Sequence, residues 1–401
     1  MSDLLVRNIG SLVTNDPSRG GLLGIVENAA VAVIDGTIAW VGNESDLPTG
    51  YTDLSALDAG GAAVLPGFVD PHTHIVFAGE RSDEFARRLR GASYEEILAA
   101  GGGIRSTVAA TRATSEDALF DMAAERAWRM LSQGTTTVEV KSGYGLDVET
   151  EAKMLRVVRR LDETLPIDVV PTFLGAHVLP VEYADDRDAY VDLVCGEMLD
   201  ACAADARFCD VFCDAAAFTV DEARRILDAA HGHGLDARVH ADQLGRVGAA
   251  ALAANLAAAS ADHLDHATGG DLASMRESGT VAVLLPAVSF SMQLPYPDGR
   301  RVWDSGVTVA LATDSNPGTA YVQSMPFVVA LAVLNMGLVP DEAVWAATRG
   351  GAMSLRLHDR GHVVPGALAD LVVLDAPTHV HLPYRPDGDL IAAVVKRGTI
   401  L

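Results

Sequence analysis

The feature that most constrains the fold of this chain is a series of eight short apolar runs rich in β-branched residues. The runs span residues 64–76, 135–141, 167–174, 208–213, 235–240, 260–266, 280–285 and 307–313. Most are separated by segments with helical spacing of apolar residues, clearest at 115–133, 149–163, 221–233, 245–258 and 270–278. Because parallel neighbours need a crossover connection, strands that alternate with helices indicate a parallel sheet. Eight such units predict a (β/α)8 TIM barrel.

Both ends of the chain predict further strands outside this barrel. Their sequences fit strands at residues 3–9, 30–35, 38–42, 370–376 and 392–401. Gly36 and Thr37, between the second and third of these, are a tight-turn signal. We therefore expect an α/β protein with a discontinuous β-sandwich domain built from residues 1–63 and 365–401, beside a barrel domain over residues 64–364.

Composition narrows the classes of function. The 401 residues are 49% hydrophobic, which is enough for a large core, and the formal net charge of -24 argues against binding nucleic acid or anionic lipid. Residues 1–10 lack a signal-peptide pattern, and no run reaches the about 18 apolar residues of a spanning helix, so we expect a cytoplasmic protein. The four cysteines lack paired C-x-x-C spacing and are expected to be free, mostly buried thiols: Cys195, Cys202, Cys209 and Cys213.

Potential metal ligands gather late in the apolar runs, where (β/α)8 barrels carry their chemistry. His72 and His74 are two apart, so on a strand they face the same side. His240 ends the fifth run, and Asp314 closes the eighth. Three imidazoles and one carboxylate suit zinc or iron with a position left open for water, and the choice between these metals stays open.

Other polar residues near the same strand ends suggest how such a site would work. A bound metal lowers the pKa of its water, and the resulting hydroxide attacks an amide or amidine carbon. Asp314 and His263, in the sixth run, are the candidates for moving the proton. His266 follows His263, and His177 lies just past the third run. Lys141 ends the second run, and we expect it to pair with a carboxylate.

Several sequence blocks carry a resemblance to known enzymes. VLPGFVDPHTH (64–74) and PGALADLVVLD (365–375) resemble the opening and closing motifs of the amidohydrolase superfamily, whose members carry a sandwich beside the barrel. Blocks over nearly the whole chain are similar to the imidazolonepropionase family: residues 72–97, 101–112, 134–146, 173–180, 239–244, 260–264 and 312–319. In the superfamily a carbamylated lysine that bridges two metals usually lies on the fourth strand. The fourth run, FCDVFC, has no lysine, which favours one metal.

The resemblance implies an activity and a set of residues. It implies hydrolysis of the cyclic amide of 4-imidazolone-5-propanoate to N-formimino-L-glutamate in histidine degradation, by a homodimer with one zinc or iron ion per subunit. The metal ligands of the family correspond to His72, His74, His240 and Asp314. The catalytic candidates are His263, Asp314 and His177. The substrate contacts fall on Arg81, Tyr94, Tyr144, His177, Gln243, Asn316, Gly318 and Thr319.

Chemistry is consistent with these roles. Arg81 can hold the propanoate carboxylate bidentately, His177 can donate to the ring oxygen, and Gly318 allows the backbone to approach the substrate. Some members of the family carry Glu at the position of Gln243. Because glutamine cannot take a proton, its presence shifts the proton-transfer role toward His263 and Asp314.

Two other functions remain open from the sequence. An aminohydrolase acting on a purine or pyrimidine ring would use the same set of histidines and aspartate, but a neutral nucleobase offers Arg81 no carboxylate. A non-catalytic barrel that serves as a binding or scaffold protein would have no need of the four candidate ligands. Metal analysis and activity measurements discriminate among the three.

Overall fold

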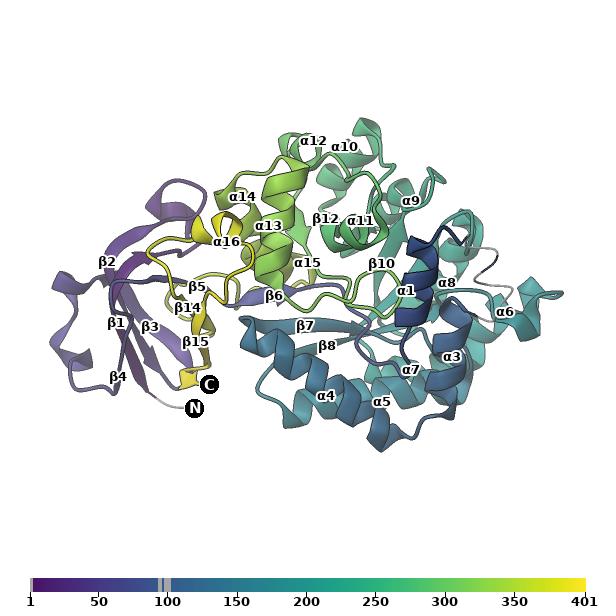
Figure 1. Ribbon diagram of the computed structural model, residues 1–401, viewed down its shortest axis with the longest axis horizontal. Coiled ribbons are helices and arrows are strands. Elements are labelled where there is room, and N and C mark those ends of the chain that lie inside the picture. Colours follow the sequence, from purple (N-terminus) through teal and green to yellow (C-terminus); the bar gives the residue numbers. More distant parts are fainter. Residues whose placement is uncertain (1–2, 93–95, 97–101) are drawn as a thin grey trace.

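Two separate β-sheets organise the chain in the computed structural model, which describes residues 3–92, 96 and 102–401 (Figure 1). One is a parallel sheet in which eight strands follow one another in sequence order, from β6 to β13. The other is a mixed sheet that combines strands from both ends of the chain. The barrel and the separate mixed sheet confirm the predicted fold class, whereas the exact domain boundaries stay a prediction.

The strands of the parallel sheet lie close to the predicted runs. They are β6 (Phe68–Asp70), β7 (Thr135–Lys141), β8 (Asp168–Ala176), β9 (Phe208–Cys213), β10 (Asp236–Ala241), β11 (Ser260–His263), β12 (Val281–Leu284) and β13 (Val309–Leu311). The barrel closes where Thr73 pairs with Ser315, just beyond β6 and β13. The amide of His74 donates to the Ser315 carbonyl at 2.9 Å, and the amide of Asp314 donates to the His72 carbonyl at 3.0 Å. This seam brings candidate ligands from the first and last strands together.

Helices surround the barrel, and their ends follow local sequence signals. The longest are α3 (Ile104–Ala113), α4 (Glu116–Ser132), α5 (Val148–Thr164), α8 (Val220–Gly232), α10 (Gly269–Ser278) and α13 (Met325–Met336). Ser115 caps α4 by accepting from the Ala118 amide, as its position predicts. The predicted helix 245–258 is shorter, as α9 (Ala249–Asn255), because the Asp242 side chain accepts the amides of residues 247–250 and fixes its start. Among the described residues, no helix is both long and apolar enough to cross a membrane.

The mixed sheet joins the two ends of the chain. Its strands are β1 (Leu4–Leu12), β2 (Val26–Ile34), β3 (Thr37–Asn43), β4 (Ala56–Asp58), β5 (Ala63–Pro66), β14 (Leu371–Leu374), β15 (Ile391–Lys396) and β16 (Thr399–Ile400). β5 pairs in parallel with β1 and antiparallel with β14. Figure 1 shows the purple N-terminal strands beside the yellow C-terminal ones.

The prediction of one strand over residues 64–76 is wrong. The run is divided at Gly67, with β5 in the mixed sheet and β6 in the barrel. Gly67 donates its amide to the Asp370 carbonyl at 2.8 Å, and a Cβ there would lie 2.2 Å from Oγ1 of Thr136. Two segments of the chain approach so closely here that glycine is required where the chain passes from the mixed sheet to the barrel. His72 and His74 follow β6 instead of lying within it.

Buried and half-buried ion pairs join the mixed sheet to the start of the barrel strands. Asp168, the first residue of β8, accepts from Lys396 at 2.9 Å and from Arg397 at 2.8 Å, and it also pairs with Arg360. Lys396 ends β15, and its ammonium lies 2.6 Å from Asp370, which precedes β14. These contacts lie at the barrel end opposite the candidate site, where residues contribute to stability more than to chemistry.

Candidate metal centre

The four candidate metal ligands converge at the carboxyl ends of the barrel strands. Nε2 of His72 and Nε2 of His74 are 3.3 Å apart, and Oδ1 of Asp314 lies 3.6 Å from the first and 3.5 Å from the second. A ring nitrogen of His240 comes within 4.8 Å of those of His72 and His74. The four side chains are at most 3% exposed as residues, so they meet in a closed space.

The local backbone explains how two of these strand ends direct their side chains inward. Asp314, after β13, has φ +50°, and His263, at the end of β11, has φ +77°. Non-glycine residues seldom adopt this left-handed conformation, and those that do concentrate at functional sites. His240 instead lies within β10, with its backbone amide bonded to Asp210.

The spacing of the donor atoms fits a shared metal ion. An ion with bonds of roughly 2.1 Å to nitrogen and oxygen ligands spaces neighbouring ligand atoms about 3.4 Å apart. The three separations of 3.3, 3.5 and 3.6 Å among His72, His74 and Asp314 are of that size. Burial lowers the pKa of His72 and of His74 well below the ordinary value, with Lys141 adding to the effect at His72 and His177 at His74. Both rings are therefore neutral, as metal ligands must be.

Two buried carboxylates orient the ligand histidines. Oδ2 of Asp262 lies 2.6 Å from Nδ1 of His72, and Oδ2 of Asp210 lies 2.9 Å from Nδ1 of His240. A carboxylate on Nδ1 fixes the proton there and leaves Nε2 with its lone pair directed at the ion position. Sequence reasoning missed both aspartates, although each is an acidic residue within a short barrel strand, FCDVFC and SADH, which is the signal that marks them.

Lys141 pairs with carboxylates, as predicted. Its ammonium lies 2.7 Å from Glu139 and 2.8 Å from Asp210, and all three side chains are fully buried. Burial alone lowers the pKa of Lys141, but Asp210 and Glu139 outweigh it and raise the pKa above the ordinary value. Since carbamylation needs a neutral amine, a lysine held in this protonated form does not bridge two metals.

His263 lies against the same cluster. One of its ring nitrogens comes within 4.8 Å of ligand atoms of His72 and Asp314. Burial, with His240 adding to it, lowers the pKa of His263 well below the ordinary value, so the ring is neutral. Burial raises the pKa of Asp314 to about 7, against the opposing effect of His240. The structure thus brings an imidazole and a carboxyl group together beside the ligand histidines.

His177 stacks on a candidate ligand. Its ring lies 5.2 Å from that of His74, nearly parallel, and 5.4 Å from the ring of Tyr144. Nδ1 donates to the Gly143 carbonyl at 2.9 Å, so the ring proton is on Nδ1. Burial lowers the pKa of His177 to about 3, which keeps the ring neutral. Nε2 therefore accepts a hydrogen bond, and the expectation that His177 donates to the ring oxygen is wrong for this tautomer.

Arg81 meets the loop that follows Asp314. The Asn316 side chain shapes this loop by accepting from the amides of Gly318 and Thr319, both at 2.8 Å. A Cβ on Gly318 would lie 2.3 Å from Nη1 of Arg81, so the guanidinium lies directly over this glycine. Nε and Nη2 of Arg81 donate to Glu84 at 3.0 and 2.5 Å, which leaves Nη1 free of that pair.

The remaining predicted residues are placed less centrally. Gln243 is half-buried in the loop after β10, where the next amide, of Leu244, donates to Asp214 at 2.9 Å. His266 is exposed, and its amide donates to the Asp242 carbonyl. Tyr94 lies outside the described residues, so its predicted contact has no structural counterpart here.

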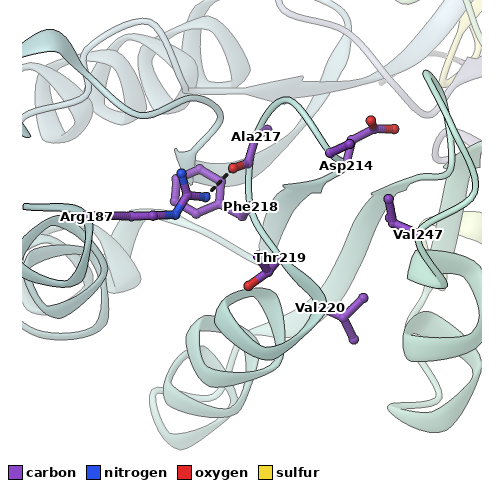
Figure 2. A pocket seen from close by; sticks show the side chains of 8 residues that line it. Arg187, Asp214, Ala217, Phe218, Thr219, Val220 and Val247 are labelled. Atoms are coloured by element: carbon purple, nitrogen blue, oxygen red, sulfur yellow. Dashed lines mark hydrogen bonds between the residues drawn. The ribbon is translucent and has the colours of Figure 1, made fainter. Parts of the chain in front are cut away.

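A cavity of about 340 Å³ lies beside the loop that follows β10. Its lining includes none of the four candidate ligands. Figure 2 shows Arg187 and Phe218 on one side of it and Asp214 and Val247 on the other. Arg187 is already engaged, because its guanidinium pairs with Glu222 and with the Ala217 carbonyl. The metal centre is therefore a separate, more enclosed site.

Comparisons with known proteins agree with this arrangement. Residues 63–401 match the model of the amidohydrolase family. An imidazolonepropionase of Mycolicibacterium smegmatis is 52% identical, over 100% of this chain and 98% of that protein. Another from Salinispora arenicola is 53% identical, over 99% of this chain and 98% of its own length.

Solved structures extend the likeness of the fold. The atrazine chlorohydrolase TrzN of Arthrobacter aurescens TC1, crystallised with zinc, superimposes with a TM-score of 0.71 over 99% of this chain and 95% of that one. At 18% identity this likeness concerns the fold alone. The full-length identity to the two sequence relatives is the closer evidence. The chain therefore belongs to the amidohydrolase family and, within it, to the imidazolonepropionases, which are hydrolases of carbon–nitrogen bonds.

Proposed function

We propose that this protein hydrolyses the ring amide of 4-imidazolone-5-propanoate to N-formimino-L-glutamate, the reaction implied by its resemblance to the imidazolonepropionases. One water is consumed. Its oxygen becomes part of a new carboxylate, the carbon–nitrogen bond of the ring breaks, and a proton is delivered to the leaving nitrogen. The observation that carries the proposal is the convergence of His72, His74 and Asp314 at 3.3–3.6 Å, beside His240.

In this proposal His72, His74, His240 and Asp314 hold one zinc or iron ion. When bound, such an ion supplies a water acidic enough to give hydroxide near neutral pH and stabilises the oxyanion that develops on the substrate. The four side chains keep the ion position closed, because none is more than 3% exposed. Asp262 and Asp210 hold the His72 and His240 rings in the tautomer that leaves Nε2 free.

The proton route uses groups that this chain places beside the ligands. One ring nitrogen of His263 lies within 4.8 Å of ligand atoms of His72 and Asp314, so this imidazole is placed to receive the proton released by the water and to pass it to the leaving nitrogen. Asp314 shares this position, because its carboxyl group lies within 4.8 Å of ligand atoms of His72 and His263. Gln243 cannot take a proton and is assigned to substrate binding.

Substrate recognition is assigned to the groups around this centre. Arg81 faces the propanoate carboxylate, with Glu84 holding its guanidinium in place. Nε2 of His177 accepts from a ring N–H, since its Nδ1 is committed to Gly143. Tyr144, only 3% exposed, contacts the rings of His74 and His177 and closes the pocket.

The test is a direct assay with substrate alternatives. The purified protein is given 4-imidazolone-5-propanoate, and the loss of its ultraviolet absorbance is followed with and without a chelator. We expect hydrolysis that the chelator abolishes and that zinc or iron restores. Turnover of guanine or cytosine instead would select the nucleobase aminohydrolase, and protein with neither stoichiometric metal nor hydrolysis would select the scaffold.

A further inference from the structure

A layer of fully buried charges lies beneath the candidate metal centre. It contains Lys141, Arg238, Glu139, Asp210 and Asp262, all 0% exposed. We call these five residues the Lys141 cluster. The reaction proposed above uses only two of its members, the aspartates that orient His72 and His240. Burying so many charges costs free energy that apolar residues would not cost. We therefore expect the cluster to perform a task that apolar residues could not perform.

Lys141 is the cation that the three carboxylates of the cluster share. Its ammonium lies 2.7 Å from Oε1 of Glu139, 2.8 Å from Oδ2 of Asp210 and 3.8 Å from Oδ2 of Asp262. The ammonium donates a hydrogen bond to Glu139 and attracts the other two carboxylates as ion pairs, the contact with Asp262 at 3.8 Å being too long for a hydrogen bond. The position of Nζ therefore fixes where these carboxylates lie relative to one another.

Each of the three carboxylates in turn contacts a segment that carries candidate ligands. Asp262 lies against Nδ1 of His72 at 2.6 Å. Asp210 lies against Nδ1 of His240 at 2.9 Å and accepts from its backbone amide at 3.1 Å. Glu139 accepts from the amide of Thr73, the residue between His72 and His74, at 3.3 Å. One ammonium is thus connected through single carboxylates to the segments of His72, His74 and His240.

Arg238 shares two of these carboxylates, Glu139 at 3.9 Å and Asp262 at 3.2 Å, but it forms no ion pair with Asp210 among the described residues. Its Nη2 donates to Asp262 at 3.2 Å and to the Pro71 carbonyl at 2.8 Å, while Nη1 donates to the Ser354 carbonyl. Two of its three hydrogen-bond partners are backbone groups, so it supports the chain before His72. Among the contacts of the described residues, Lys141 is the cation that reaches Asp210 within 4 Å.

We propose that Lys141 is a positioning residue that sets the spacing of the metal ligands by holding Glu139, Asp210 and Asp262 together. This inference rests on the proposed metal site. It gives the buried lysine a task distinct from bridging two ions. Because the lysine acts through carboxylates that touch the ligand segments, its loss alters the affinity and geometry of the metal site before it alters any contact with substrate.

The test compares Lys141→Met with Lys396→Met. Lys396 is a matched control, because it is also buried and also lies within 2.9 Å of two carboxylates, but those are Asp168 and Asp370 at the other end of the barrel. Metal-free protein is titrated with Co²⁺, and the affinity and the visible d–d absorption spectrum are recorded. Both variants lose thermal stability. We expect only Lys141→Met to bind Co²⁺ about 10–100-fold more weakly, with an altered spectrum.

A graded variant covers the case in which Lys141→Met does not fold. Glu139→Gln keeps the side-chain size and weakens one of the three connections, so it should lower Co²⁺ affinity by less than the lysine variant. The inference is wrong if Lys141→Met binds Co²⁺ with wild-type affinity and spectrum. If only Glu139→Gln folds, the same result for that variant overturns the inference. Failure of the wild-type protein to bind Co²⁺ would instead overturn the proposed metal site itself.

Discussion

Gln243 separates substrate binding from proton transfer at the scale of one residue. Its amide can hydrogen-bond but cannot take a proton, and the surrounding loop is held by Asp242 and Asp214 independently of its side chain. We predict that Gln243→Ala raises KM about tenfold or more, as expected for the loss of one or two polar contacts, and changes kcat much less. Steady-state kinetics decide this, and an unchanged KM with a collapsed kcat would contradict the assignment.

Gly318 is a second position where a single added carbon atom is expected to change substrate binding. A methyl group there would lie 2.3 Å from Nη1 of Arg81, so Gly318→Ala must displace the guanidinium or the loop. We predict a KM raised about tenfold, with most of the thermal stability retained, because Arg81 leaves the position that faces the substrate carboxylate. Gly50→Ala is the control, since a Cβ there meets no atom within 4 Å. Equal kinetics in the two variants would remove Arg81 from substrate binding.

At the scale of structural elements, the loop 142–147 depends on one carboxylate of the following helix. Glu151, in α5, accepts from the amides of Gly143 at 2.9 Å, Gly145 at 2.7 Å and Leu146 at 2.8 Å, and it is fully buried. The loop carries Tyr144 and the Gly143 carbonyl, which accepts the hydrogen bond from Nδ1 of His177. The conformation of the loop is therefore set from outside the loop.

We predict that Glu151→Ala destabilises the protein by about 3 kcal/mol or more, since each buried amide left without an acceptor costs roughly 1–3 kcal/mol. It should also raise KM, because Tyr144 and His177 lose their support. The comparison is Glu149→Ala, an exposed position two residues earlier in the same helix. Chemical denaturation and kinetics measure both effects. Equal stability of the two variants would show that water or a rearranged loop replaces the carboxylate.

Local sequence patterns predicted most of the elements and the candidate ligands. Strand runs, helix caps such as Ser115 and the order of His72, His240 and Asp314 along the barrel depend on short-range periodicity, which a sequence displays directly. The division at Gly67 did not follow from the pattern, because both halves of the run are equally apolar and only the approach of Thr136 distinguishes them.

The buried charged residues that contact the ligand histidines could not be predicted from the sequence. Asp262 contacts His72 across 190 residues of chain, and Asp210 meets Lys141 from another strand. Such contacts depend on how far each strand is shifted along its neighbour, which no local pattern encodes. The hydrogen-bond role of His177 was likewise hidden, since its tautomer depends on a carbonyl 34 residues earlier.

At the scale of the whole molecule, Asp168 joins the barrel to the mixed sheet and makes stability depend on pH. Burial alone raises the pKa of Asp168, but Lys396 and Arg360 outweigh it and hold the pKa below the ordinary value of 3.8. The stabilisation is therefore present above that pH and is lost as the pH falls through the folded-state pKa.

We predict that Asp168→Asn lowers stability by about 2 kcal/mol at pH 7, because three cations lose a shared carboxylate while Lys396 keeps Asp370 and Arg360 keeps Asp359. The deficit should shrink as the pH falls through the folded-state pKa of Asp168, because the wild-type carboxylate then becomes protonated and loses its charge. Thermal melts of both proteins between pH 7 and pH 3 test this. A deficit of the same size at every pH would assign the effect to packing and not to the ion pairs.

Metal removal should also act on the whole molecule. Ions that bind only the folded state stabilise it by about 2.7 kcal/mol at a free concentration of 100 Kd. Dialysis against a chelator should therefore lower Tm, and restoring zinc or iron should raise it again. An unchanged Tm after the metal has left would mean that the four candidate ligands are not the ones that bind it.

The seam at Thr73 and Ser315 has a consequence for the order of events during biosynthesis. Asp70 and Thr313, which hydrogen-bond beside it, are 243 residues apart, and His72 and His74 are almost as far from Asp314 in the chain. While the ribosome is still making the last barrel strand, His72 and His74 have no Asp314 to face. Capture of the ion by all four ligands must therefore wait until translation has passed residue 314.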